Sequence, residues 1–185
     1  MRSRCSLAVL AVGMATMFSF APARAAGLDP TQQAKIDAKI QVIKSWASNP
    51  AVIAAVKAHN ANLPADQAAM TQDKWAGLTV LDPMVRSFTK NETALFLKSK
   101  KTDDIAEAFV SDAAGFKVAF LTKTSNWCHK GKPKHDMPMA GKTWQGQIEV
   151  DASSGVQQIQ VAVPVMDGGK PIGSLVVGLS IAKLG

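Results

Sequence analysis

The sequence has only two cysteines, Cys5 and Cys128. Cys5 lies in an N-terminal stretch that we expect to be removed as a secretory signal, so Cys128 would be the only thiol left. No disulfide could then form within the mature chain. In an oxidising compartment a lone thiol is buried, bound to another group, or free to link two chains.

Long hydrophobic runs are also scarce. The run 6–21 follows Arg2 and Arg4 and precedes the small residues Ala23 and Ala25, which is the pattern of a cleaved signal peptide. It is short for a bilayer span, and no later run reaches spanning length. We therefore expect a signal peptide at 1–25, followed by a single domain that is soluble in the periplasm.

Several function classes lack their signatures. The formal net charge is +7. Removing the signal takes three arginines and no acid, and the remaining excess is too small to indicate a nucleic-acid partner. The sequence contains no GxSxG motif, no phosphate-binding glycine loop and no two-cysteine haem motif. We predict a binding protein rather than an enzyme.

The first half of the mature chain, about 30–101, has the pattern of helices. Apolar residues recur at helical spacing as Ile36, Ile40, Ile43 and Ala47. Asn49 and Pro50 then mark an interruption, because asparagine caps helices and proline suits their first position. We predict a long N-terminal helix that bends there, followed by shorter helices.

The second half, about 104–183, changes to the alternation typical of strands. The stretches 112–115 and 166–170 supply turns between consecutive strands. The segment "PIGSLVVGLSI" is apolar on both faces and should be a central strand. Alternation also groups residues of two other segments on single faces: Trp144, Gly146, Ile148 and Val150; Ile159, Val161, Val163 and Val165. The pattern predicts an α+β fold with a five-stranded antiparallel sheet.

The strands carry motifs in a recognisable order. A "DxxG" turn at 112–115 is followed by Thr124 and Ser125, then by the aromatic Trp127, and later by the hairpin "PVMDGGKPIG" at 164–173. In this order the chain resembles the extracytoplasmic sensor domains of the PDC or Cache type, which are PAS-like. The resemblance covers most of the mature chain. It implies a single Cache domain, with a long N-terminal helix packed on one face of a five-stranded antiparallel sheet.

The resemblance also implies a function. Such domains bind small molecules outside the membrane, as parts of chemoreceptors and sensor kinases. This chain is therefore expected to bind a small molecule and to dock with a membrane sensor kinase or chemoreceptor. One departure is clear: the segment "NWCHKGKPKHDMPMAGKTW" is basic where such domains often carry acidic residues. The ligand of a typical member cannot be transferred to this chain.

The same segment predicts a ligand site between the sheet and residues 123–144. Trp127 and Trp144 flank it and could form flat apolar walls. Five lysines and one aspartate at 123–142 favour an anionic metabolite. The candidate ligand-binding residues are Trp127, Lys123, His129, Trp144, Asp151 and Gln158. A purely structural role is the alternative, with tryptophans in the core and lysines keeping a loop soluble.

A soft metal is the alternative ligand. The candidate metal ligands are Cys128, His129, His135, Met137 and Met139. Sulfur and imidazole suit copper, and thiol and thioether favour Cu(I). The spacing matches no standard zinc motif, and Lys130, Lys132 and Lys134 would repel a cation. Copper binding therefore remains the second hypothesis, and no other cofactor is expected.

Overall fold

Helices fill the first half of the structure, a computed structural model that describes residues 27–151 and 155–184. The expected signal peptide lies outside these residues. The helices are α1 (Pro30–Ala47), α2 (Pro50–Ala61), α3 (Ala65–Ala68), α4 (Gln72–Gly77), α5 (Pro83–Lys90), α6 (Glu92–Lys100) and α7 (Pro133–Met139). The strands are β1 (Ile105–Asp112), β2 (Lys117–Phe120), β3 (Trp144–Val150), β4 (Gln157–Asp167) and β5 (Lys170–Ser180), and the short 3-10 helix η1 (Ile181–Lys183) follows.

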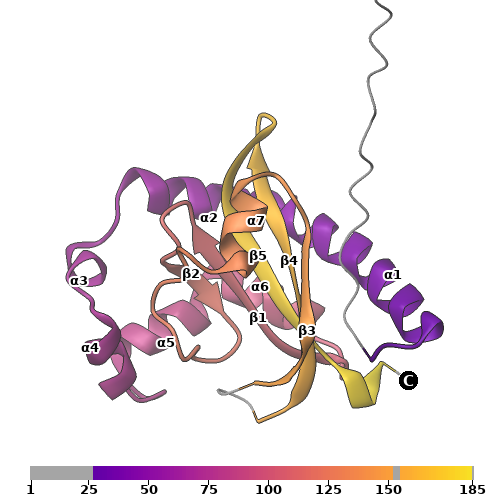
Figure 1. Cartoon of the computed structure of the whole chain (residues 1–185). Helices are drawn as coiled ribbons and strands as arrows, with labels where there is room; N and C mark the ends of the chain where they lie inside the picture. The colour runs from indigo at the N-terminus through magenta and orange to yellow at the C-terminus, as the bar shows by residue number, and fades with distance from the viewer. Residues whose placement is uncertain (1–26, 152–154, 185) are drawn as a thin grey trace, which may run out of the picture.

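The five strands form one antiparallel sheet in the order β2-β1-β5-β4-β3. Helices α1 and α2 lie behind this sheet and α7 lies in front of it (Figure 1). The predicted fold class, α+β with a five-stranded antiparallel sheet, is confirmed. The prediction that 171–181 forms a central strand is confirmed too, because β5 lies between β1 and β4.

The N-terminal helix is two helices rather than one bent helix. Asp29 caps α1 with a capping box that includes Gln32, and the Asn49 side chain accepts a hydrogen bond from the backbone N–H of Ala51 at the start of α2. Pro50 occupies the first position of α2, where the missing N–H has no partner to lose. The local signals are therefore strong enough to end one helix and start another.

The sheet face covered by α1, α2 and α6 is named the helix face here. Alternate residues of the strands meet the apolar sides of the helices there and are fully buried. The main residues of this core are Ile36, Ile40, Ile43, Val52, Val56, Val110, Ile159, Val161, Val163, Leu175, Val177 and Leu179. The expectation that Ile159, Val161, Val163 and Val165 share one face is confirmed.

The opposite sheet face is named the cavity face. Part of it carries a second, aromatic core, which packs against α4, α5 and residues 121–143: Trp75, Val85, Phe88, Phe109, Phe120, Trp127, Ala162 and Val176. The rest of this face is polar. None of the described helices is long and apolar enough to cross a membrane.

Two details of the second half differ from the prediction. In β3, Trp144 pairs with Ala162 but Ile148 pairs with Ile159, because the register shifts between Gln145 and Ile148. Ile148 therefore points to the helix face and Trp144 to the cavity face, and the predicted alternation is wrong. The segment 133–139, expected to be loop, forms α7, which begins with a proline at its first position and packs on β4 and β5.

Candidate functional site

Residues 121–143, including α7, cross the cavity face and are named the cover segment here. Between the cover segment and strands β1, β3 and β4 lies a cavity of about 190 Å³. Its walls combine the ring of Phe109 with mostly polar side chains; the lining residues are Glu107, Phe109, Thr124, Ser125, Asn126, His129, Lys134, Glu149, Val150, Asp151 and Gln160. Its volume corresponds to roughly six molecules of liquid water at about 30 Å³ each.

Glu107 is the most buried acid on the cavity wall. It projects from β1, and the side-chain amides of Gln158 and Gln160 on β4 both donate hydrogen bonds to its Oε1, the first at 2.7 Å. Gly178 of β5 makes room for this arrangement, since a Cβ there would lie 2.1 Å from Oε1 of Gln158. The carboxylate of β1 is thus placed and oriented by neighbours on two other strands, β4 and β5.

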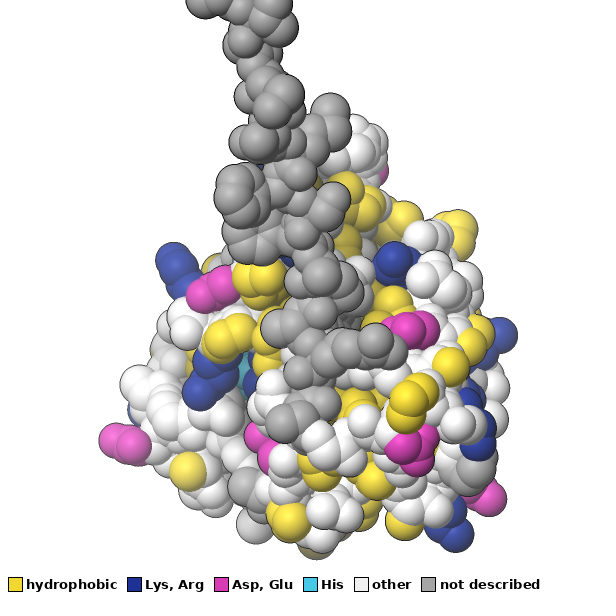
Figure 2. Space-filling view, turned by 45° about the vertical axis from the view of Figure 1, so that its right-hand side comes forward, with side chains coloured by type: hydrophobic (Ala, Val, Ile, Leu, Met, Phe, Trp, Pro, Cys, Tyr) yellow, Lys and Arg dark blue, Asp and Glu magenta, His cyan; other side chains and the backbone are white. Residues whose placement is uncertain are grey.

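The charges of the cavity are mixed, with an excess of acid. Burial raises the pKa of Glu107, and the negative charge of Asp151 raises it further. Lys134 donates a hydrogen bond to Oε1 of Gln160, and burial lowers the pKa of its ammonium although nearby acids oppose this. Glu149 is the third acid on the wall. Acidic and basic side chains are interspersed over the described part of the face in Figure 2, without a continuous patch of one sign.

His129 forms another part of the wall and is uncharged. Its ring stacks on Phe109 with centroids 4.7 Å apart, and its Nδ1 contacts the Nζ of Lys117. Burial and the neighbouring lysines lower the pKa of His129 to about 2. Lys117 is fully buried, and burial lowers its pKa well below the ordinary lysine value. The imidazole therefore offers neutral hydrogen-bonding chemistry to the cavity.

Two of the predicted ligand-binding residues, His129 and Asp151, lie on the cavity wall. Gln158 lies one layer behind it and contacts Glu107. Trp127 is buried in the aromatic core, with its ring centroid 5.1 Å from that of Trp75, and Trp144 packs against the same core. The Nζ of Lys123 lies 4.9 Å above the Trp75 ring. The structure therefore brings these six residues together only in part.

The candidate metal ligands do not converge on one point. The thiol of Cys128 donates to the carbonyl of Ala114 at 3.4 Å, and the His135 Nδ1 lies 2.8 Å from the hydroxyl of Ser174. Met137 and Met139 are half-buried at the end of α7. Across residues 27–151 and 155–184, no group of three or more His, Cys, Asp or Glu side chains could hold a metal ion. The copper hypothesis gains no support.

Several wall residues were not predicted, above all Glu107, Phe109, Lys134 and Gln160. One signal was available in the sequence. Glu107 stands in the apolar stretch "IAEAFV", and a charged residue inside a buried strand is rarely there for packing alone. Within "VQQIQV", Gln158 and Gln160 alternate with the helix-face residues Ile159 and Val161, so they too are polar residues on the opposite face of a buried strand.

A second hollow lies at the β2 edge of the sheet, between α2 and the α5–α6 pair. It is an open cleft of about 650 Å³, lined mostly by apolar atoms, including four alanines of α2. Two of its polar side chains are engaged elsewhere, because His59 pairs with Asp112 and Asn91 donates to the carbonyl of Val118. Neither ionisable side chain that lines the cleft, His59 or Glu92, is buried, whereas Glu107 and His129 of the cavity wall are, so the cleft is the weaker candidate.

No family model matches the sequence, and no curated protein matches it. Solved structures do match. The sensor domain of E. coli DcuS is 14% identical, with a TM-score of 0.48, over 84% of this chain and 96% of that one. The ligand-binding domain of the Pseudomonas fluorescens chemoreceptor CtaA, in complex with L-serine, is 16% identical, with a TM-score of 0.48, over 83% and 56%.

The sensor domain of the V. cholerae histidine kinase DctB is 15% identical, with a TM-score of 0.42, over 82% of this chain and 58% of that one. The chain thus spans little more than half of the CtaA and DctB domains. With TM-scores below 0.5, no ligand, partner or residue role follows from the likeness. PDC/Cache-type sensor domains are the proteins that this chain resembles, in its sequence motifs and among solved structures.

Proposed function

We propose that the chain is a periplasmic binding module that holds a small organic molecule in the cavity beneath the cover segment. The observation that carries this proposal is the carboxylate of Glu107, which is only 6% exposed, lies on the cavity wall and has no basic partner within hydrogen-bond distance among the described residues. Lys134 attracts this carboxylate without a hydrogen bond to it, and burying a carboxylate that has no hydrogen-bonded opposite charge costs free energy. A positively charged ligand that pairs with Glu107 would offset this free-energy cost.

The ligand that fits this cavity carries a positively charged nitrogen. The lysine-rich cover segment predicted an anion, but the lysines are not gathered at the cavity: Lys134 alone among them is on its wall, while Glu107, Glu149 and Asp151 are on it too. A molecule that also carries a carboxylate could pair with Lys134. We propose a small amine or amino acid, of a size that matches about 190 Å³.

A thermal-shift screen of amines, amino acids and carboxylates tests this proposal. A ligand at a hundredfold excess over its Kd stabilises the folded state by about 2.7 kcal/mol, which raises the melting temperature by roughly 5–10 °C for a domain of this size. We expect amines and amino acids to give this shift and Glu107→Gln to abolish it. The exposed Glu92→Gln is the matched control and should keep the full shift. Hits that shift Glu107→Gln as much as the wild type would place the site elsewhere.

We propose in addition that the occupied module signals through a membrane sensor kinase or chemoreceptor, the partner class that the sequence resemblance suggests. Crosslinking in cells, with and without the ligand found in the screen, tests this step. A crosslink to a membrane receptor that depends on ligand supports it, and a ligand-independent pattern contradicts it. Intact mass of the periplasmic protein tests the localisation, with Ala26 as the expected first residue.

A further inference from the structure

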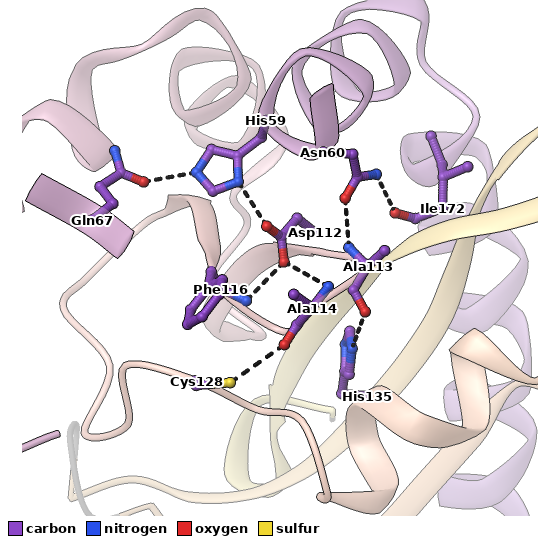
Figure 3. A network of polar contacts seen from close by, with 10 residues as sticks. All are labelled: His59, Asn60, Gln67, Asp112, Ala113, Ala114, Phe116, Cys128, His135 and Ile172. Atoms are coloured by element: carbon purple, nitrogen blue, oxygen red, sulfur yellow. Dashed lines mark hydrogen bonds and ion pairs between the residues drawn. The ribbon is translucent and has the colours of Figure 1, made fainter. Parts of the chain in front are cut away.

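The turn between β1 and β2, residues 112–116, is held from the helix side by the end of α2 (Figure 3). His59 Nδ1 lies 2.8 Å from Oδ2 of Asp112, and His59 Nε2 lies 2.7 Å from Oε1 of Gln67. The next residue, Asn60, accepts a hydrogen bond from the backbone N–H of Ala113 at 2.9 Å. Two consecutive side chains of α2 therefore fix the turn.

Asp112 also shapes the turn itself. While Oδ2 faces His59, Oδ1 accepts hydrogen bonds from the backbone N–H groups of Ala114 at 3.0 Å and Phe116 at 2.8 Å. The side chain is 4% exposed, so water cannot easily replace these partners. One carboxylate thus joins the end of α2 to the conformation of the turn.

The other side of the turn holds the cover segment. The carbonyl of Gly115 accepts a hydrogen bond from the backbone N–H of His129 at 2.9 Å, and the carbonyl of Ala114 accepts one from the thiol of Cys128 at 3.4 Å. The approach is close, because a Cβ on Gly115 would lie 2.4 Å from the backbone nitrogen of Lys130. His129 is itself part of the cavity wall. The turn therefore connects α2 to the cover segment, which forms part of the cavity wall.

We infer that His59 and Asp112 are positioning residues for the cavity: through the turn 112–116, protonation of His59 determines how firmly residues 128–135 are seated over it. The functional consequence rests on the proposed function, because a loosely seated cover would hold a ligand less tightly. The contact geometry is independent of that function. The mechanism requires only that His59 binds and releases a proton.

The direction of the effect follows from the contacts of His59. Burial lowers its pKa, but the hydrogen bonds to Asp112 and Gln67 and the negative charge of Asp112 outweigh burial, so the pKa is raised above 6.5. A raised histidine pKa stabilises the seated form fully below the ordinary pKa, and this stabilisation is lost as the pH rises through the raised value. A neutral ring donates only one hydrogen bond, so it cannot serve both oxygen acceptors.

Other titratable groups near the turn respond differently. Across the cleft from His59 lies Glu92 of α6, and beyond the turn lie Lys117 of β2 and His135 of α7. Burial lowers the pKa of His135, and His129 is neutral above a pKa of about 2. Among the three histidines of the chain, His59 alone is thus expected to change charge above the ordinary histidine pKa. Lys117 also has a lowered pKa, so the test compares variants rather than pH values alone.

Hydrogen exchange of the ligand-free full chain tests the inference. Exchange is followed by mass spectrometry in peptides that cover 126–136, and each rate is divided by the intrinsic rate at its pH. Between about pH 5.5 and pH 8.5, we expect protection in the wild type to fall about three- to tenfold, which is the change in an equilibrium that the net loss of one hydrogen bond produces. Protection in His59→Gln should be low at both pH values.

Two further variants complete the test. Lys57→Gln removes a charge from the same helix, at a residue that pairs with Asp167 rather than with the turn, and should behave like the wild type. Asp112→Asn keeps an acceptor for the turn but removes the charge, and should weaken the pH dependence even if His59→Gln does not fold. Equal pH dependence in the wild type and both turn variants, or none in the wild type, overturns the inference. Because no ligand is present, this result is separate from the fate of the proposed amine site.

Discussion

The two faces of the sheet are made by the same strands but have opposite chemistry. In β4, Ile159, Val161 and Val163 point to the helix face and pack on α1 and α2. The alternate residues Gln158 and Gln160 point to the cavity face and hold Glu107. Because side chains alternate along a strand, one segment can build a stable core and a polar site at once. The comparison indicates that the larger apolar core lies on the helix face, whereas the cavity face combines a smaller aromatic core with the polar cavity.

A few buried polar atoms have no hydrogen-bond partner. Among the described residues, four buried side-chain atoms lack a hydrogen-bond partner: Thr93 Oγ1, Ser111 Oγ, Trp127 Nε1 and Gln158 Oε1. Ser111, Trp127 and Gln158 lie on or above the cavity face, and Thr93 lies on α6. Buried polar groups are normally paired. None of these four residues is among those that line the cavity, and Thr93 lines the cleft, so the unpartnered atoms belong to the packed layers rather than to the cavity wall.

The largest effect is expected from truncation on the helix face. Leu179 is fully buried at the centre of the sheet, so Leu179→Ala should lower the free energy of unfolding by about 2–5 kcal/mol. Denaturant titration measures this loss. Leu179→Met, which nearly conserves volume, should lose less than about 1.5 kcal/mol. If Leu179→Ala were as stable as Leu179→Met, the helix face would not be the main source of stability.

The contact between the turn and the cover segment should give the next effect. Gly115 and Gly131 both have positive φ, at 88° and 82°, but a Cβ meets backbone atoms only at Gly115. Gly131→Ala should therefore lose only the backbone term of about 1–2 kcal/mol. Gly115→Ala should lose more, about 3 kcal/mol, because two backbone segments must separate. Equal losses in the two variants would mean that the cover is not seated on the turn.

On the cavity face, removing a charge should stabilise the protein while it abolishes binding. Burial and Asp151 raise the pKa of Glu107 above 4.5, so the folded protein binds this proton more tightly than the unfolded chain does. The destabilisation by the ionised carboxylate is absent below about pH 4.5 and grows as the pH rises through the folded pKa. Glu107→Gln should therefore match the wild type at low pH and be more stable at neutral pH.

Unfolding curves at several pH values test the Glu107 prediction. Glu92→Gln, at an exposed position in the first turn of α6, makes the same chemical change without burial. It should not be more stable than the wild type at any pH, and at neutral pH it should lose at most about 0.3–1 kcal/mol of helix-dipole stabilisation. A Glu107→Gln protein that is less stable than the wild type at neutral pH would contradict the interpretation of Glu107 as a buried acid whose charge destabilises the fold until a ligand binds.

The smallest effect is expected from the unpartnered hydroxyl on α6. Thr93 is 1% exposed and its Oγ1 has no partner, so Thr93→Val replaces a buried polar atom by a methyl group of similar size. We expect the free energy of unfolding to stay equal or to rise by about 1 kcal/mol. A melting curve tests this, with Thr89→Val, which loses a hydrogen bond to Arg86, as the comparison. A clear loss in Thr93→Val would mean that the hydroxyl has a partner.

The fold was more predictable than the site because the two depend on different signals. The alternation of apolar residues and the glycines of the turns are enough to predict the strands. As expected, Gly168 and Gly169 form the β4–β5 turn with positive φ. The register shift in β3 follows from pairing with β4 and has no local signal. The short helix α7 contains two prolines and is stabilised by packing on β4 and β5. This packing cannot be seen in the local sequence around the helix.

The site was harder to predict because the number of lysines in a segment does not show which of their side chains point to the cavity. Five lysines in and around the cover segment suggested an anion, yet one of them, Lys123, lies over the Trp75 ring, and only Lys134 is on the cavity wall. The acids that dominate the wall lie outside the cover segment: Glu107 comes from β1, and Glu149 and Asp151 come from the end of β3 and the residue after it. His129 and Asp151 could be named from composition, but Glu107 depends on the order of strands in the sheet.

The central place of β5 has a consequence for how the chain acquires its structure. β5 is the last strand in sequence, yet it bonds to both β1 and β4 and joins the β1–β2 pair to the β3–β4 pair. During synthesis the sheet cannot be completed until residues 170–180 have emerged, and the closure of such a long loop slows folding. Until then the β1–β2 pair and the β3–β4 pair lack the strand that joins them into one sheet.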